Sequence, residues 1–365
     1  MDQPRDPRYA ATGVDSTKAE TGLARLRTWV EKTFPLNPTA RPYLPLGYFA
    51  NIIRLDGLDT GIAISTDGVG TKLLVAELLG KYDTMGIDCI AMNVNDLLCV
   101  GATPVSFVDY IAVEELQPAI LEEIGKGLFR GAELARVSIS GGEIAQIKEM
   151  VRGVREGSGF DLAGTAIGTV PLDRVIVGQD VQPGDTVIGL ASSGIHSNGL
   201  TLARRVLLHE AKLTVDSYLQ EFGRTVGEEL LEPTRIYVPE VTAMFAAGLQ
   251  LKALIHLTGD GFFNLTRTAA PIGYLIHTLP PTPPIFAVLQ EVGRLSDAEM
   301  CQVYNLGIGF CVVVAEPDAE RVVQIAAEHG TRAWRIGTTV ASPERTITIE
   351  PRRLQSREQR FVSQQ

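Results

Sequence analysis

Cysteine is scarce in this sequence, and no hydrophobic run is long. The four cysteines, Cys89, Cys99, Cys301 and Cys311, form no Cys-x-x-Cys pair. This spacing argues against a zinc site or a disulfide framework and favours buried free thiols in a reducing compartment. The longest apolar runs, such as residues 308–315, are far too short to cross a bilayer, and the first residues contain no apolar signal core. We therefore expect a soluble, cytoplasmic protein.

Positive charge is also in short supply. The chain has 33 Lys and Arg residues against 43 Asp and Glu, so its formal net charge is −10. Such an acidic balance argues against non-specific binding to nucleic acid or to an anionic membrane. A phosphorylated substrate would therefore have to be neutralised locally, by a metal ion or by a few basic side chains.

The chain is too long for one ordinary core. Its 365 residues are 45% hydrophobic and 21% charged, which is typical of a globular protein with two domains. We expect an amino-terminal domain over residues 1–170, a second domain over 171–350, and a polar, frayed tail over 351–365. We expect both strands and helices in each of the two domains.

Neither common glycine-rich nucleotide motif is present. The stretch from Ser65 to Lys72 lacks the Walker A spacing, and Gly68 and Gly70 have no third glycine to complete Gly-x-Gly-x-x-Gly. It still lies between an expected strand and an expected helix, where glycines and free amides favour an anion. Asp67 at the strand end is suited to a hard cation such as Mg²⁺. The alternative is a simple strand–turn–helix corner with a solvated Asp67 and Lys72.

Residues 85–98 form a second stretch with polar side chains. Apolar residues at helical spacing predict a helix with one buried face. Asp88, Asn95 and Asp96 share one side of it, at i, i+7 and i+8. A solvated face is the ordinary interpretation, but the amides beside the acids favour a polar site.

The remaining elements are predicted from periodicity and turn residues. A helix should follow Asp15-Ser16, with an apolar face of Leu23, Leu26, Trp29 and Val30. A strand from Val137 should run into a Gly141-Gly142 turn that carries Glu143. Further strands are expected at 52–55, 62–65, 105–113, 160–170, 186–191, 308–315 and 332–339, and further helices at 72–79, 119–135, 200–211 and 318–329.

A loop in the second half repeats the plan of strand, small polar loop and helix. It contains Ser192, Ser193, Gly194, His196, Ser197 and Asn198. Hydroxyls, backbone amides and a helix start are together suited to an anion, and the nearby Thr234 and Arg235 could assist. The plain alternative is that Ser197 or Asn198 only caps the helix.

Together these stretches resemble one family, the aminoimidazole ribonucleotide synthetases, also called phosphoribosylformylglycinamidine cyclo-ligases. The matching segments occur in family order from about residue 9 to 340: 13–15, 65–72, 86–97, 140–143, 192–199, 233–238, 256–259 and 305–309. The resemblance implies two α/β halves, with the amino-terminal sheet paired across a homodimer and a mixed sheet in the carboxyl-terminal half. It also implies ATP-driven closure of the imidazole ring of formylglycinamidine ribonucleotide, releasing ADP and phosphate, in purine biosynthesis.

The resemblance also implies roles for particular residues. Mg²⁺ would be held by Asp67, Asp96 and Glu143. ATP would be bound by Asp67, Gly68, Gly70, Thr71, Lys72, Asp88, Asn95, Gly141 and Gly142, with Lys72 meeting the triphosphate. The substrate would be bound by Ser192, Ser193, Gly194, His196, Ser197, Asn198, Thr234 and Arg235, through its ribose phosphate. His196 or His256 would move a proton during ring closure, with a purely structural role as the alternative for either.

The sequence departs from the family pattern in two places. A glycine-rich segment is here Leu46-Gly47-Tyr48-Phe49-Ala50, and the loop after Glu143 has lost a second acid, with Gln146 in its place. The alternatives are therefore another ATP-using member of the superfamily, similar to formylglycinamide ribonucleotide amidotransferase or selenophosphate synthetase, and a non-catalytic nucleotide-binding paralogue. Retention of Asp67, Lys72, Asp96 and Glu143 together argues against the paralogue.

Overall fold

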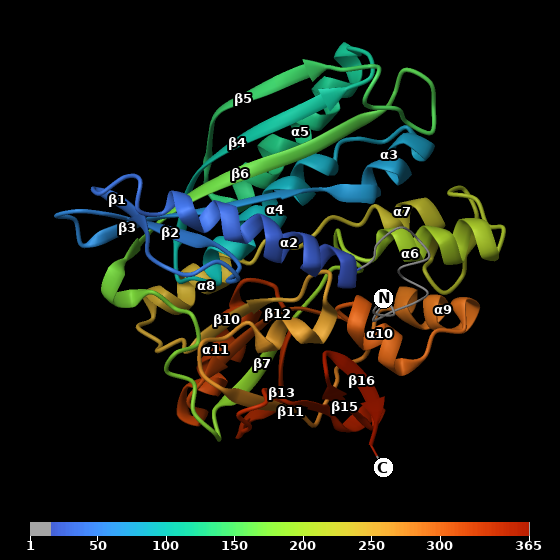
Figure 1. Ribbon diagram of the computed structural model, residues 1–365. Coiled ribbons are helices and arrows are strands. Elements are labelled where there is room, and N and C mark those ends of the chain that lie inside the picture. Colours follow the sequence, from blue (N-terminus) through green and yellow to red (C-terminus); the bar gives the residue numbers. More distant parts are fainter. Residues whose placement is uncertain (1–15, 365) are drawn as a thin grey trace.

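The computed structural model describes residues 16–364, which form two sheets one above the other, with helices between and around them (Figure 1). The first sheet has six strands in the order β1-β2-β3-β6-β4-β5. All neighbours are antiparallel except β4 and β5, which are parallel. The strands are β1 (Ala40–Pro42), β2 (Asn51–Leu55), β3 (Thr60–Gly68), β4 (Thr103–Val113), β5 (Ser138–Gln146) and β6 (Phe160–Pro171).

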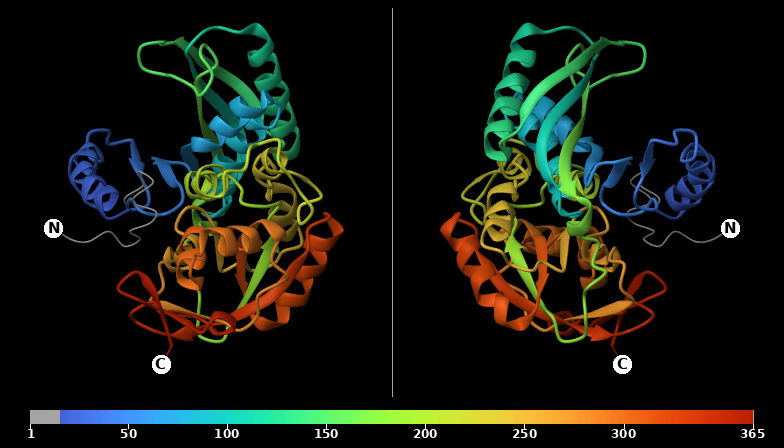
Figure 2. Two further views of the ribbon diagram at one scale, coloured as in Figure 1. Left: turned by 90° about the vertical axis from the view of Figure 1, so that its right-hand side faces the viewer. Right: turned by 90° about the vertical axis from the view of Figure 1, so that its left-hand side faces the viewer.

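One face of this sheet is covered by helices α4 (Met85–Leu98) and α5 (Pro118–Ala135), as Figure 2 shows from two sides. Burial alternates along β3, as expected for a strand with one covered face. Gly61 and Ala63 are buried, whereas Ile62 and Ile64 point to the other face and are only partly covered. The edge strand β5 is exposed along nearly its whole length. The described chain therefore leaves one face and one edge of the first sheet open.

The second sheet has eight strands in the order β10-β12-β7-β13-β11-β14-β15-β16. Its central strands β7 and β12 are buried at every position, which fits their near-continuous apolar sequences. The strands are β7 (Thr186–Ala191), β10 (Ala253–His256), β11 (Ile272–Ile276), β12 (Ile308–Val314), β13 (Ala333–Ala341), β14 (Ile347–Ile349), β15 (Leu354–Arg357) and β16 (Arg360–Ser363). The expected α/β class with two mixed sheets is confirmed.

The remaining elements are short helices and one small hairpin. The α-helices are α2 (Ser16–Val30), α3 (Leu73–Leu79), α6 (Leu200–Arg204), α7 (Val226–Leu230), α8 (Val238–Ala246), α9 (Pro284–Gly293), α10 (Asp297–Val303) and α11 (Ala319–Glu328). The hairpin pairs β8 (Tyr218–Leu219) with β9 (Arg224–Thr225). None of the helices within residues 16–364 combines the length and the apolar character needed to cross a membrane.

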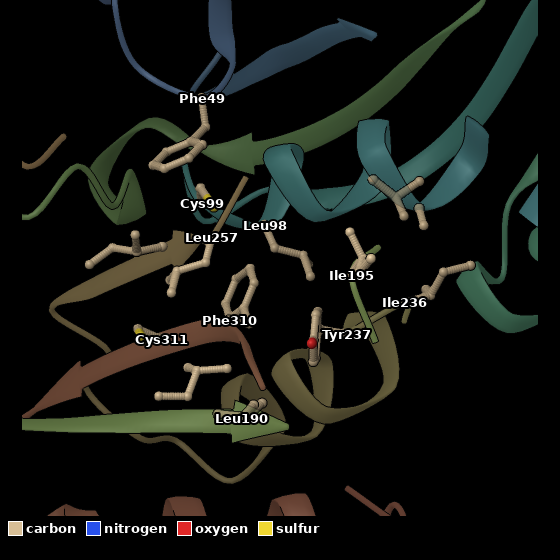
Figure 3. Close-up of a cluster of buried hydrophobic side chains, with 14 of the residues drawn as sticks. Phe49, Leu98, Cys99, Leu190, Ile195, Ile236, Tyr237, Leu257, Phe310 and Cys311 are labelled. Atoms are coloured by element: carbon tan, nitrogen blue, oxygen red, sulfur yellow. The ribbon is translucent and has the colours of Figure 1, made fainter. Parts of the chain in front are cut away.

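The two halves share one apolar core (Figure 3). Phe49, Leu98 and Cys99 of the first half lie above Leu257 and Phe310 of the second. The rings of Tyr237 and Phe310 have centroids 5.1 Å apart. All four cysteines are buried and free, as the sequence predicts. The buried interface positions the amino-terminal elements against the loops of the second sheet.

Three sequence predictions differ from the structure. Helix α2 forms, but Leu23, Leu26 and Trp29 are 61%, 59% and 70% exposed, because α2 makes few contacts with the rest of the described chain. The expected cap residue Asp15 lies outside the described residues. Gly141 and Gly142 make no turn, because β5 continues through them as the parallel partner of β4.

The third difference is the carboxyl-terminal tail. It is not frayed after Arg352, because β15 and β16 form a hairpin that extends the second sheet. Leu354 and Phe361 are buried, and the Phe361 ring lies 4.5 Å from that of Phe263, centroid to centroid. These two apolar side chains pack the otherwise polar tail against the second half.

Candidate active site

Two predicted metal ligands, Asp67 and Asp96, lie close to each other between the two halves. Asp67 is near the end of β3, where its Oδ1 accepts a hydrogen bond from the Gly68 N–H at 2.7 Å. Asn93 on α4 donates to the Asp67 backbone carbonyl at 3.1 Å and fixes the strand end against the helix. Burial raises the pKa of the Asp67 carboxyl, and the neighbouring negative charge of Asp96 raises it further. A cation between these carboxylates would relieve both effects.

His256 at the end of β10 orients Asp96. Its Nδ1 lies 2.9 Å from Asp96 Oδ1 and donates a hydrogen bond to that carboxylate. The His256 side chain is fully buried, and its Nε2 has no hydrogen-bond partner among the described residues. Asp96 is partly exposed, at 14% of its side chain. Of the two, Asp96 is the group that a ligand can reach.

The polar face of α4 holds the segment 232–238 of the second half. Asn95 Nδ2 donates to the Arg235 carbonyl at 2.9 Å, and Asn95 Oδ1 accepts from the Tyr237 N–H at 3.0 Å. Asp88 Oδ1 accepts from the Thr234 N–H at 2.7 Å and from its hydroxyl at 2.6 Å. Asp88 and Asn95 are fully buried. This face is therefore neither solvated nor open to a nucleotide, and it joins the two halves.

Lys72 belongs to the same network. Its ammonium lies 2.9 Å from each carboxylate oxygen of Asp88 and donates to the Glu232 carbonyl at 2.6 Å. Burial lowers the pKa of the Lys72 ammonium, whereas the Asp88 carboxylate raises it. Neither side chain of this ion pair is exposed. The placement differs from the expectation that Lys72 meets a triphosphate, because its charge is already paired inside the protein.

The loop after β7 is closed by its own contacts. Ser192 donates to Asn305 Oδ1 at 3.0 Å, and the Asn305 amide donates to the Gly194 carbonyl at 2.9 Å. The Ser193 hydroxyl donates to the Pro233 carbonyl. The Ser197 hydroxyl donates to Asp88 Oδ1 at 3.1 Å. These polar groups hold the loop in place, and neither Ser197 nor Asn198 caps α6, because its N-cap is Gly199 without a side-chain hydrogen bond.

His196 lies in this loop with a left-handed backbone, at φ 66°. Its Nε2 accepts from the Ser193 N–H at 3.3 Å, and its buried Nδ1 has no partner among the described residues. Burial lowers the pKa of His196 well below its usual value, and the nearby His256 lowers it further. The ring is therefore neutral near pH 7. It packs on Gly309, where an added Cβ would lie 2.4 Å from His196 Cε1.

The other predicted residues fall in several places. Gly70 has a left-handed φ of 71°, and the Thr71 and Thr201 hydroxyls are 2.8 Å apart across the two halves. A Cβ at Gly68 would contact the Leu162 carbonyl at 3.5 Å, whereas a Cβ at Gly70 would have nothing within 4 Å. Asn198 contacts the Met92 sulfur at 3.9 Å, and its Oδ1 lies beside Gly259. Arg235 Nη1 donates to the Thr331 hydroxyl at 2.9 Å, so it is held inside the second half.

Glu143 is not brought to Asp67. The register aligns Asp67, Gly164, Asp109 and Gly142 across four strands, and directly paired residues share a face. Glu143 is one position further and points to the open face. Within residues 16–364, no group of three or more His, Cys, Asp or Glu side chains is arranged to hold a metal ion. Of the predicted metal ligands, the structure brings together Asp67 and Asp96, and Mg²⁺ commonly takes one or two carboxylates plus substrate phosphates.

Asp109 is a carboxylate that the sequence interpretation missed. It is half-buried on the covered face of the first sheet, and burial raises the pKa of its carboxyl. Gly142 lies beside Asp109, and a Cβ at position 142 would be 2.3 Å from Asp109 Oδ1. The sequence offered one signal for this residue, an acidic side chain within the mostly apolar strand 105–113.

Similarity to known proteins agrees with this architecture. Residues 49–170 match the family model "AIR synthase related protein, N-terminal domain", and residues 182–350 match the corresponding C-terminal domain. The fold and these matches define an AIR synthase related protein. A phosphoribosylformylglycinamidine cyclo-ligase of Methanothermobacter thermautotrophicus is 46% identical over 90% of this chain and 93% of its own. One from Methanocaldococcus jannaschii is 48% identical over 78% and 80%. The chain belongs to the phosphoribosylformylglycinamidine cyclo-ligase family.

Solved structures show the same fold at low sequence identity. Thiamine-monophosphate kinase from Stenotrophomonas maltophilia K279a is 18% identical, with a TM-score of 0.56 over 89% of this chain and 94% of that one. Thermotoga maritima PurL complexed with ADP is 16% identical, with a TM-score of 0.53 over 84% of this chain and 44% of that one. These structures support the fold alone.

Proposed function

We propose that the chain closes the imidazole ring of formylglycinamidine ribonucleotide, using ATP, to give aminoimidazole ribonucleotide, ADP and phosphate. The observation that carries this proposal is the 46% identity over 90% of the chain to a cyclo-ligase. The Asp67 and Asp96 carboxylates between the two halves agree with it. The alternatives from the same superfamily share the fold, but no contact within residues 16–364 favours one of them.

The reaction needs activation more than it needs a protein nucleophile. Transfer of the terminal phosphoryl group of ATP to the substrate amide oxygen makes that oxygen a leaving group. A nitrogen of the same substrate attacks the activated carbon, and phosphate departs. Catalysis of this kind is mainly positioning and charge neutralisation. Mg²⁺, held by Asp67 and Asp96, would neutralise the phosphates.

The protein side chains then act by holding the site in shape. We assign His256 the task of orienting Asp96, because its Nδ1 is 2.9 Å from that carboxylate. Lys72, Asp88, Asn95 and Thr234 fix the two halves together, so their effect on ATP and substrate is indirect. His196 supports the loop, because it is buried and neutral.

ATP and the substrate would bind to different residues around this site. For ATP we keep Gly68, Gly70 and Thr71 beside Asp67, because the backbone at Gly70 is open. For the substrate we keep the loop from Ser192 to Asn198, through its backbone and through Asn198.

We further propose a cytoplasmic homodimer. The open face of the first sheet carries Ile62, Ile64, Tyr110 and Ile167, and leaving such a face in water is unfavourable. The unpaired edge β5 would also gain from a second chain. Glu143 and Gly141 lie on this face, whereas Gly142 faces Asp109 on the covered side. Any role of Glu143 with the metal or of Gly141 with ATP would then depend on the dimer.

The test is an assay of the purified chain with ATP, Mg²⁺ and formylglycinamidine ribonucleotide. We expect ADP release that depends on the substrate, with the imidazole product formed in equal amount. Substrate-independent ADP release without imidazole would indicate another ATP-using member of the superfamily. Nucleotide binding with no ADP release at all would identify the non-catalytic paralogue.

A further inference from the structure

A cavity of about 360 Å³ lies between the amino-terminal segment and the second half, and arginine dominates its charge. Its lining includes Arg27 on α2, Arg267 and Arg345, together with Gly47 and Tyr48. No Asp or Glu lines it, although acidic residues outnumber basic ones in the whole chain, 43 to 33. A local excess of positive charge in an acidic protein attracts anions.

Two of these guanidinium groups are held rigidly by backbone. Arg267 donates to the Tyr48 carbonyl at 3.0 Å and to the Gly47 carbonyl at 3.4 Å, and it stacks 3.9 Å over the Phe49 ring centroid. Arg345 donates to the Thr266 and Ala269 carbonyls, each at 2.9 Å. Carbonyls hold a guanidinium without cancelling its charge. Among the described residues, neither arginine has a carboxylate partner within ion-pair distance.

Donor capacity remains after these contacts. A guanidinium has five N–H donors. Arg267 uses Nε and Nη2, and Arg345 uses Nη1 and Nη2, so Nη1 of Arg267 and Nε of Arg345 have no protein acceptor among the described residues. Arg27 pairs through Nε with Glu31 at 2.6 Å, and its Nη1 is directed at Gly47. A phosphate in this cavity would meet donors that are already in position.

Packed side chains connect the cavity to the proposed active site. Arg267 packs on Phe49, which lies over Cys99 at the end of α4 (Figure 3). The Cys99 thiol is within electrostatic reach of both Asp96 and Arg267. The arginines therefore lie in the neighbourhood of the Asp67–Asp96 pair. The predicted phosphate ligand Arg235 is less suited, because it donates to Thr331 inside the second half.

We propose that Arg27, Arg267 and Arg345 bind the 5′-phosphate of the ribonucleotide substrate. This inference rests on the proposed function for the identity of the ligand, but the cavity itself is defined by its charge. Phosphate binds arginine through short, charge-assisted hydrogen bonds. The rest of the ribonucleotide then points toward Asp67 and Asp96.

Calorimetry at constant ionic strength tests the cavity without turnover, with ribose 5-phosphate and inorganic phosphate as probes. Arg27→Gln is the main variant, because the side-chain hydrogen bond of Arg27 among the described residues goes to Glu31 on its own segment. We expect it to weaken ribose 5-phosphate binding about tenfold, the loss of one charge-assisted contact. Arg25→Gln, an exposed arginine on the same helix, is the matched control and should bind as the wild type does. Equal affinity in Arg27→Gln and Arg25→Gln would overturn the proposal.

Kinetics identify the source of the phosphate. Arg27→Gln should raise KM for formylglycinamidine ribonucleotide about tenfold and leave KM for ATP within twofold. A rise confined to ATP would overturn the assignment to the substrate. If the chain bound ribose 5-phosphate in the expected way but formed no imidazole, the proposed function would fail and the phosphate site would stand. Arg267→Lys, which keeps the charge, should weaken binding less than Arg267→Gln; equal losses would mean that Arg267 acts only by packing.

Discussion

The ammonium of Lys72 lies 2.9 Å from both carboxylate oxygens of Asp88, and neither side chain is exposed. Asp88 also accepts from Thr234 and Ser197. This ion pair therefore joins the stretch from Ser65 to Lys72 to two segments of the second half. Removing one partner of a buried pair leaves an uncompensated charge.

Lys72→Met should therefore lower the free energy of unfolding by about 3–5 kcal/mol. The measurement is urea unfolding. Lys126→Met, which removes an exposed partner of Glu122, is the control and should leave stability nearly unchanged. If Lys72→Met instead kept full stability and raised only KM for ATP, Lys72 would be a triphosphate ligand after all.

The carboxylate of Asp67 gives a second prediction. If it holds the metal with Asp96, Asp67→Asn should reduce kcat by about 100-fold or more while the melting temperature changes little. Loss of the charge also relieves the repulsion from Asp96. The exposed Asp59→Asn should keep full activity. Full turnover in Asp67→Asn would remove it from the site.

Helices and strands were easier to predict from the sequence than the residues that their side chains contact. The apolar spacing in 85–98 gave helix α4 with the right limits, and its polar side chains did form a buried cluster. Their acceptors and donors lie about 140 residues away, at Thr234, Arg235 and Tyr237, and no local pattern encodes that distance. The interpretation of Asp88 and Asn95 as nucleotide ligands could not be separated from domain docking without the tertiary structure.

Glycine was also ambiguous in the sequence. Gly141 and Gly142 suggested a turn, but Gly142 is required because Asp109 occupies the place of its side chain. Glycine permits both a turn and a close approach, and only the neighbouring strand decides which. The apolar stripe of α2 was similarly visible from the sequence, but its exposure in the described chain was not.

His196 predicts how stability depends on pH. Burial keeps its ring neutral in the folded protein, whereas in the unfolded chain the ring takes up a proton below about pH 6.5. The unfolded state then binds more protons, so stability falls as pH falls below that value, by at most about 1.4 kcal/mol per pH unit for this group. His196→Asn, which tolerates the left-handed backbone, should lose this part of the slope between pH 6.5 and 5. The exposed His209→Asn should retain it; equal slopes in the two variants would contradict the assignment.

Gly309 makes room for two side chains at once. An added Cβ would lie 2.1 Å from Tyr237 Oη and 2.4 Å from His196 Cε1, and both side chains are buried. Gly309→Ala should destabilise the protein by about 1–3 kcal/mol in urea unfolding, since the core cannot give way freely. Gly125→Ala in α5 has nothing within 4 Å and should stabilise by about 0.5–1 kcal/mol. An equal effect of both substitutions would mean that the packing around Gly309 is loose.

The open face of the first sheet yields the last prediction. Ile64 and Ile167 are directly paired on β3 and β6, and both point away from α4 and α5. If a second copy covers this face, light scattering at micromolar concentration should give twice the chain mass. Ile64→Lys should then give the monomer, because an unpaired charge is costly to bury, and the monomer should keep its helical circular dichroism. Leu58→Lys is the control, because Leu58 is 53% exposed in a turn and should leave the dimer intact. A wild-type chain that stays monomeric, or an Ile64→Lys dimer of unchanged affinity, would show that the sheets do not pair through this face.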